Sequence, residues 1–219
     1  MPKVVPRWEW RWFGRRFGPA EARLATLTQG AVQESRETYL LSGTGDNVKV
    51  RDALMDVKVL RETRPDGLEQ WTPVMKAGFP LPAAEVAKVF AALRLDPPLL
   101  RRASYDLEQF ITELALPSGR IRAIDVQKRR TRYTVGGCMA ELSEVVADGK
   151  ATRTLAVESE DPAAVIAAVR SLGLSGYVNT SYPRGLSALL DDTPSRYAVI
   201  DVGTNSIKFH VAEPASDGH

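Results

Sequence analysis

Basic residues recur at every second position in several valine-rich segments of this chain. Lys49 and Arg51 show this spacing in one segment, and Lys128, Arg130 and Arg132 repeat it in a later one. Successive side chains of a β-strand point to opposite faces, so each set of basic groups shares one face of its strand. In a closed barrel, such faces either look outward to water or converge on one axis. We predict convergence, and a solvated outer face is the alternative.

Turn signals divide the chain into many short candidate strands and a few helices. Pro117-Ser-Gly, Gly136-Gly137 and Asp148-Gly149 separate the later strands, and Asp-Gly is a strong hairpin signal. Pro73 places its strand at an edge or a bulge. Together these elements predict an α+β protein built on an antiparallel eight-stranded tunnel barrel with flanking helices. The strand candidates span residues 8–13, 32–42, 47–51, 54–62, 68–76, 105–116, 120–135, 138–147 and 150–160.

The helices are predicted from their end signals and apolar spacing. A short helix begins at Pro19, and an amphipathic one lies between Pro82 and Leu95. Asp161 and Pro162 form the start of a third, and a short one covers residues 186–190.

Composition limits the chemistry that this chain can support. Its 219 residues are 44% hydrophobic, which suits one large domain, and the formal net charge is only +2. Any affinity for anions must therefore come from the local arrangement of Lys and Arg. A single cysteine, Cys138, excludes an internal disulfide, and the two histidines lie too late in the chain for a His/Cys metal site. The N-terminus lacks an uninterrupted apolar run, so we expect a cytoplasmic protein without a membrane partner.

Four carboxylates lie where they could oppose the basic strands. Glu9, Glu141, Glu158 and Glu160 occupy strand positions that suit one wall of the barrel. Carboxylate oxygens facing a basic wall could hold Mg²⁺ or Mn²⁺ between protein and phosphate. The alternative for Glu158 and Glu160 is structural, because either could neutralise a neighbouring arginine.

The ordered set of charged motifs resembles the CYTH, or triphosphate tunnel metalloenzyme, superfamily over about residues 8–190. The segments that carry the resemblance are Val48 to Asp52, Asp56 to Lys58, Lys128 to Tyr133, Ala140 to Val145, Val157 to Glu160 and Asn179 to Tyr182. The resemblance implies a tunnel in which acidic residues bind metal and basic residues grip a triphosphate. It gives substrate contacts to Lys49, Arg51, Lys58, Lys128, Arg130 and Arg132, and metal contacts to Glu9, Glu141, Glu158 and Glu160.

Two positions depart from the pattern of that superfamily. Its opening Glu-x-Glu-x-Lys is replaced here by Glu9-Trp-Arg11-Trp-Phe13, and Ser143 stands where an acid usually follows Glu141. Arg11 would repel a divalent ion and attract phosphate, because reversing one charge about 4 Å from such an ion changes the interaction by several kcal/mol. Arg11 is therefore counted with the phosphate-binding residues.

The end of the chain carries a separate motif. An apolar strand delivers Asp201, and the turn Gly203-Thr204-Asn205-Ser206 follows it. Backbone N–H groups of such a turn can cradle phosphate. The segment resembles the first phosphate loop of the exopolyphosphatase and guanosine pentaphosphate phosphohydrolase family, within the acetate kinase and actin-like ATPase superfamily. We expect domains at 1–192 and 193–219, the second being the start of a phosphatase domain in a longer protein. A plain β-hairpin is the alternative.

These observations predict a degenerate tunnel that binds inorganic polyphosphate, or another triphosphate-containing small molecule, with little or no turnover. Its further partner would be the missing C-terminal phosphatase domain, and no feature predicts specific nucleic-acid binding. The first alternative is an active metal-dependent triphosphatase or polyphosphatase using Glu9, Glu141, Glu158 and Glu160. The second is a structural or dimerisation domain whose barrel interior is apolar and filled.

Overall fold

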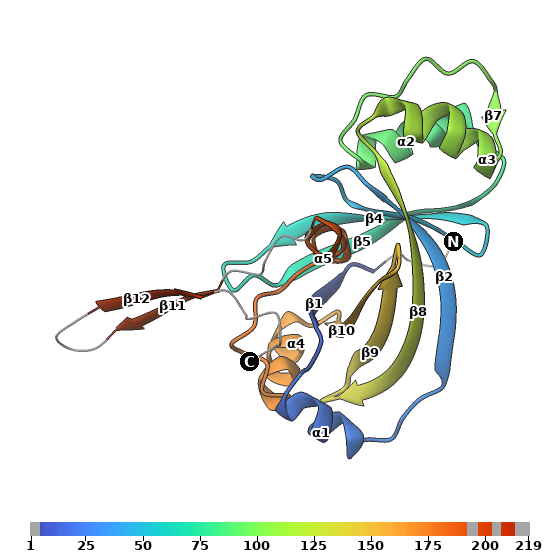
Figure 1. Ribbon diagram of the computed structural model, residues 1–219. Coiled ribbons are helices and arrows are strands. Elements are labelled where there is room, and N and C mark those ends of the chain that lie inside the picture. The colour runs from blue at the N-terminus through green and yellow to red at the C-terminus, as the bar shows by residue number, and fades with distance from the viewer. Residues whose placement is uncertain (1–4, 192–196, 203–206, 213–219) are drawn as a thin grey trace.

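Eight antiparallel strands close into a barrel in the computed structural model, which describes residues 5–191, 197–202 and 207–212. The barrel order within this described part is β1-β10-β9-β8-β2-β3-β4-β5, and β5 pairs again with β1. The predicted α+β barrel is thus confirmed, and its elements are drawn in Figure 1. The strands are β1 (Arg7–Gly14), β2 (Val32–Leu41), β3 (Asn47–Arg51), β4 (Leu54–Thr63), β5 (Glu69–Gly78), β8 (Arg122–Val135), β9 (Cys138–Ala147) and β10 (Lys150–Ser159).

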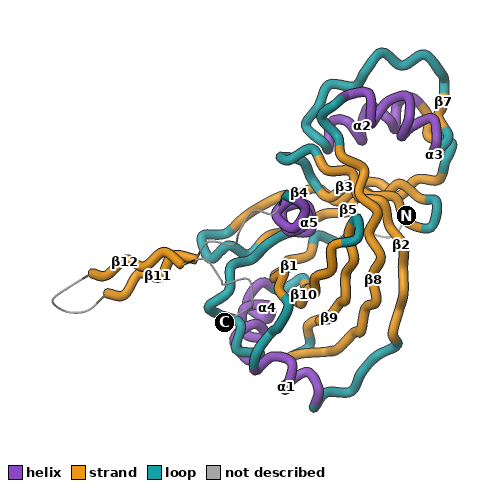
Figure 2. Tube along the Cα trace, in the orientation of Figure 1, coloured by secondary structure: helices purple, strands orange, loops and turns teal. Residues whose placement is uncertain are grey.

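Helices and a two-stranded ribbon flank the barrel (Figure 2). The helices are α1 (Pro19–Ala25), α2 (Ala83–Ala92), α3 (Leu107–Gln109), α4 (Pro162–Ser171) and α5 (Tyr182–Leu190). A π-helical turn (Phe110–Ala115) and a 3₁₀ turn (Leu116–Ser118) continue α3, and the ribbon pairs β6 (Leu81–Pro82) with β7 (Ser104–Tyr105). No helix of the described residues has both the length and the apolar character needed to cross a membrane.

The expectation of a strand at residues 105–116 was wrong, because this segment is helical after Tyr105. Asp106 caps the helix by accepting a hydrogen bond from the Gln109 backbone N–H at 2.8 Å, and the Gln109 Oε1 accepts one from the Asp106 backbone N–H at 3.1 Å. This reciprocal box satisfies two donors at a helix start. Phe110 and Leu114, four positions apart, are both buried. Spacing by four is helical and not the period of two that a half-buried strand requires.

The barrel buries apolar side chains on its outer surface. On β3, Val48 and Val50 point outward and pack with Phe90 of α2. On β1, Trp8 and Trp10 belong to a second outer cluster that includes residues of α1 and α4. The tryptophans therefore form a packing face. Helices cover these outer faces, which leaves the alternate, polar residues of the same strands for the lumen.

Helix α5 fills one end of the lumen. Tyr182 and Leu186 of α5 are buried in a cluster with Leu41, Val126 and Val145. These three strand residues lie at even spacings from Tyr39, Lys128 and Glu141, so they belong to the inner faces of their strands. Gly185 packs so tightly here that a Cβ would lie 2.3 Å from the Phe13 ring. The barrel is thus closed at this end by an apolar plug.

The C-terminal segment forms a separate hairpin of β11 (Tyr197–Val202) and β12 (Ile207–Ala212). Asp201 lies in β11, opposite Lys208 in the ladder. Gly203, Thr204, Asn205 and Ser206 lie outside the described residues. The proposed phosphate loop and the start of a phosphatase domain at 193–219 therefore stay predictions.

We expect Gly185→Ala to destabilise the fold by loosening the plug. Alanine favours a helix by about 1 kcal/mol over glycine. Overpacking a filled site costs about 1–3 kcal/mol, so the clash with Phe13 should leave a net destabilisation of up to about 2 kcal/mol. Urea denaturation measures this difference. Gly176→Ala is the control, because nothing lies within 4 Å of its added Cβ. Equal stability of both variants would contradict the tight packing of α5.

Candidate functional site

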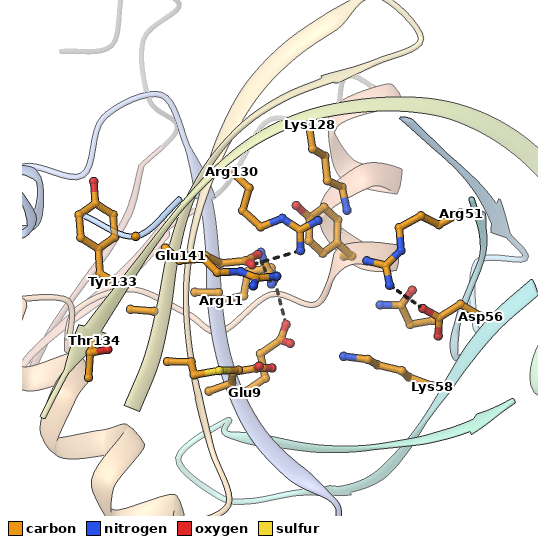
Figure 3. A pocket seen from close by; sticks show the side chains of 18 of the residues that line it. Glu9, Arg11, Arg51, Asp56, Lys58, Lys128, Arg130, Tyr133, Thr134 and Glu141 are labelled. Carbon is orange, nitrogen blue, oxygen red and sulfur yellow. Dashed lines mark hydrogen bonds and ion pairs between the residues drawn. The ribbon is translucent and has the colours of Figure 1, made fainter. Parts of the chain in front are cut away.

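A cavity of about 740 Å³ occupies the lumen beyond α5. Figure 3 shows charged side chains from several strands directed into it. Among the described residues, seven cationic side chains line the cavity against four carboxylates. The cations are Arg11, Lys49, Arg51, Lys58, Lys128, Arg130 and Arg132, and the carboxylates are Glu9, Asp56, Glu141 and Glu158. The basic residues thus face a common interior, and the alternative of a solvated outer face does not hold for them.

A buried carboxylate that the sequence analysis missed holds the basic wall together. Glu37 of β2 is 1% exposed and accepts hydrogen bonds from Lys49 at 3.0 Å and Lys128 at 2.8 Å. Its other oxygen lies 3.8 Å from both Arg51 and Arg130. One sequence signal was available: Glu37 falls two positions before Tyr39 in a predicted strand that also carries Gln33 and Ser35 on that face. That polar stripe marks an inner face.

Burial and charge shift the pKa values of this group in opposite directions. Burial raises the pKa of Glu37, but Lys128 and Lys49 overcome it and hold the pKa far below the usual range. Burial lowers the pKa of Lys128 to about 8, against the pull of Glu37. Burial, with the charge of Lys128, likewise lowers the pKa of Lys49 to about 8. Both lysines are therefore mainly charged at neutral pH and lose that charge in mildly alkaline solution.

Arg11 bridges two of the predicted metal ligands. Its Nε donates to Glu9 at 2.9 Å, one Nη to Glu141 at 3.0 Å, and the other Nη to the Thr154 hydroxyl at 3.0 Å. The guanidinium carbon also lies 4.3 Å from the Tyr182 ring centre. Arg11 is 5% exposed, so its charge is enclosed by these partners. Burial raises the pKa of Glu141, but Arg11 and Arg130 bring it down to about 2.

This arrangement does not fit a protein-held Mg²⁺ or Mn²⁺. A guanidinium occupies the space between Glu9 and Glu141, and a second cation there would be repelled. Glu158 lines the cavity but pairs with Arg7 at 3.4 Å, while Glu160 is exposed beyond the end of β10 and does not line it. Within the described ranges, no group of three or more Asp, Glu, His or Cys side chains is placed to hold a metal ion.

Several cations in the cavity lack strong partners. The Arg130 side chain is 11% exposed, and its buried Nε and one buried Nη have no hydrogen-bond acceptor in the part of the chain that the structure describes. Its ion pairs with Glu37 and Glu141 are long, at 3.8 and 3.7 Å. No ion pair of Lys58 is found among the described side chains, and Figure 3 shows its amine directed into the cavity. A buried donor without an acceptor is costly, so this wall is suited to an incoming anion.

The loop before α5 fixes the position of Glu9 and Arg11. The Asn179 side chain accepts a hydrogen bond from the Arg11 backbone N–H at 2.7 Å and donates to the Glu9 carbonyl at 3.3 Å. The backbone N–H of Thr180 donates to the Arg11 carbonyl at 2.7 Å. Asn179 and Thr180 are far from β1 in the sequence, and their hydrogen bonds fix the β1 backbone from which Glu9 and Arg11 extend into the lumen.

No family model matches the chain, and no curated protein matches it. Similar solved structures include a protein from Pyrococcus horikoshii OT3, at 15% identity and a TM-score of 0.44 over 78% of this chain and 91% of that one. A candidate adenylyl cyclase from Hippeastrum, described as having a dominant triphosphatase activity, has 12% identity and a TM-score of 0.47 over 85% and 96%. A candidate adenylate cyclase from Bacillus halodurans has 11% identity and a TM-score of 0.46 over 81% and 96%. The chemistry of this cavity must be inferred from its own residues.

We expect Arg11→Ala to destabilise the protein by about 3 kcal/mol at neutral pH, the low end for a broken buried pair, because Glu9 and Glu141 are partly buried and lose the cation that donates hydrogen bonds to both. Millimolar Mn²⁺ should restore part of the melting temperature of the variant by entering between the two carboxylates. Thermal unfolding with and without Mn²⁺ measures both effects. Arg11→Lys is the control, since it keeps the charge and should not respond to Mn²⁺. A native-like Arg11→Ala variant would contradict the bridging role.

Proposed function

We propose that the barrel cavity binds inorganic polyphosphate, or another small molecule with a phosphoanhydride chain, and retains it without turnover. The observation that carries this proposal is the guanidinium of Arg130, which lines the cavity with two buried donors that lack acceptors. Arginine presents a planar fork of donors that matches the oxygens of a phosphoryl group. A phosphate that drew this guanidinium further into the cavity would satisfy donors that the protein itself leaves unpaired.

The distribution of cations favours a chain of phosphates over a single anion. Lys58 enters from β4, Arg51 from β3 and Arg130 from β8, so positive groups surround the space from several strands. A ligand with successive negative groups contacts more of them at once than a lone carboxylate does. The cavity of about 740 Å³ is large enough for several linked phosphoryl groups.

The aromatic residues of the cavity do not favour a nucleobase. The Lys128 amine lies 3.8 Å from the ring centre of Tyr182 and 4.7 Å from that of Tyr39, and Arg11 also lies over Tyr182. Cations already lie over these two rings, and Tyr133, which also lines the cavity, is 8% exposed and packs in the outer apolar cluster. Base recognition usually needs a free aromatic face. We therefore propose recognition of phosphate groups and not of a nucleoside.

Arg11 supports retention over hydrolysis. Its fixed charge lies between Glu9 and Glu141, where the rival hypothesis of a metal-dependent triphosphatase requires a divalent ion. Phosphate release from tripolyphosphate in the presence of Mg²⁺ or Mn²⁺ tests that rival directly. Release that is lost in Glu158→Gln would establish the enzyme, whereas binding with no release supports our proposal.

We expect Arg130→Ala to weaken polyphosphate binding by about tenfold to a hundredfold, which is the usual effect of losing hydrogen bonds to a charged group. Arg129→Ala is the matched control, because Arg129 precedes it on the opposite face of β8 with its side chain 52% exposed. Both variants lose one positive charge, so a nonspecific charge effect would weaken both equally. Calorimetric titration at several salt concentrations measures the affinities, which should fall steeply as salt rises.

Binding should also weaken as the pH rises through about 8. Lys49 and Lys128 have pKa values lowered to about 8, so each is mostly charged at pH 7 and mostly neutral at pH 9. A bound polyanion holds them in the charged form, so each lysine contributes a loss of affinity of roughly tenfold over this interval. Titrations at constant ionic strength measure the change. A constant affinity between pH 7 and pH 9 would contradict the contact of either lysine with the ligand.

A further inference from the structure

We propose that the cavity accepts the end of a linear phosphate chain, terminal phosphoryl group first, and cannot be threaded by the interior of a chain. This inference rests on the proposed binding of polyphosphate and adds which part of the molecule is recognised. It is carried by the closure of one end of the lumen and by the position of the cations relative to that closure.

The closed end leaves no passage for a chain. Leu186 of α5 is fully buried, and the inner-face residues around it are 0–4% exposed, namely Leu41, Ile124, Val126, Val145 and Ala147. The end of α5 is also tied to the barrel, because the Lys150 amine donates to the carbonyls of Leu189 and Leu190 at 3.3 and 3.2 Å. Arg122 pairs with Asp191 just beyond the helix at 2.5 Å. An anionic chain would have to cross a packed apolar plug, which costs several kcal/mol for each buried charge.

The cations next to the plug suit a terminal group. Tyr182 of α5 forms the floor, and the Lys128 amine lies 3.8 Å from its ring centre. Arg130 follows Lys128 on the same inner face of β8, two positions further from the plug. A terminal phosphoryl group carries between one and two negative charges near neutral pH, because its second ionisation resembles that of a phosphomonoester, while an interior group carries one. The deepest cations therefore favour the end of the chain over its interior.

End recognition fixes the binding stoichiometry. A linear polyphosphate has two ends, so it should bind two protein molecules whatever its length, once it is long enough for both to fit. A protein that grips the interior would instead bind in numbers proportional to length. Cyclic metaphosphates have no terminal phosphoryl group, so they should bind more weakly than linear chains.

The test is a calorimetric titration of the full chain with size-fractionated linear polyphosphates and with cyclic trimetaphosphate. We expect two protein molecules per chain in every long fraction and an affinity per chain end that does not change with length. Cyclic trimetaphosphate should bind at least about tenfold more weakly than linear tripolyphosphate, because it lacks the more highly charged terminal groups. Stoichiometry that rises in proportion to chain length, or equal binding of the cyclic and linear forms, would overturn end recognition.

Two further binding experiments distinguish a failure of end recognition from a failure of the proposed function. Linear polyphosphate with both ends blocked as bulky phosphoramidates should no longer bind if the protein recognises chain ends. Undiminished binding of the blocked chains would overturn end recognition but would leave the proposed binding of polyphosphate intact. Arg130→Ala distinguishes the cavity from the outer surface, because binding in the cavity should weaken in this variant and surface binding should not. If no linear fraction binds at all, the proposed function fails, and end recognition fails with it.

Discussion

The carboxylate of Glu37 is the constraint on which the cavity depends. Lys49 and Lys128 approach it at 3.0 and 2.8 Å, and Arg51 and Arg130 lie 3.8 Å away. Two like charges about 4 Å apart repel by about 4 kcal/mol at an effective dielectric near 20, so converging cations need a buried anion between them. Glu37 of β2, which is itself buried, supplies that anion. The same four cations line the cavity.

Arg11 has the corresponding role on the opposite wall. There the excess is negative, and the guanidinium joins Glu9 and Glu141 with two short hydrogen bonds. Each wall thus carries its own counter-charge, and Arg130 and Lys58 are the cavity cations with the weakest partners among the described residues. The helices make this possible by covering apolar outer faces, so the stability of the barrel does not require an apolar lumen. The plug of α5 supplies apolar burial inside, at one end only.

Much of the fold followed from local signals. Gly136-Gly137 and Asp148-Gly149 fixed the hairpins between β8, β9 and β10, and Pro73 coincides with a register shift in the pairing of β4 and β5. The segment after Tyr105 is helical where a strand was predicted, because its capping box starts a helix and its buried residues are spaced by four. Glu37 was missed because a lone glutamate in a strand gives no local sign of the four cations that meet it from two other strands, β3 and β8.

The sequence by itself determined which residues share a face, since the alternation of side chains along a strand is a local property of the backbone. It therefore predicted that Lys49 and Arg51 act together, as do Lys128 and Arg130. The tertiary structure alone decided which face turned inward, that Arg11 lies between Glu9 and Glu141, and that α5 closes the lumen. These depend on strand order and on contacts between residues more than a hundred positions apart, and no local pattern encodes such distances.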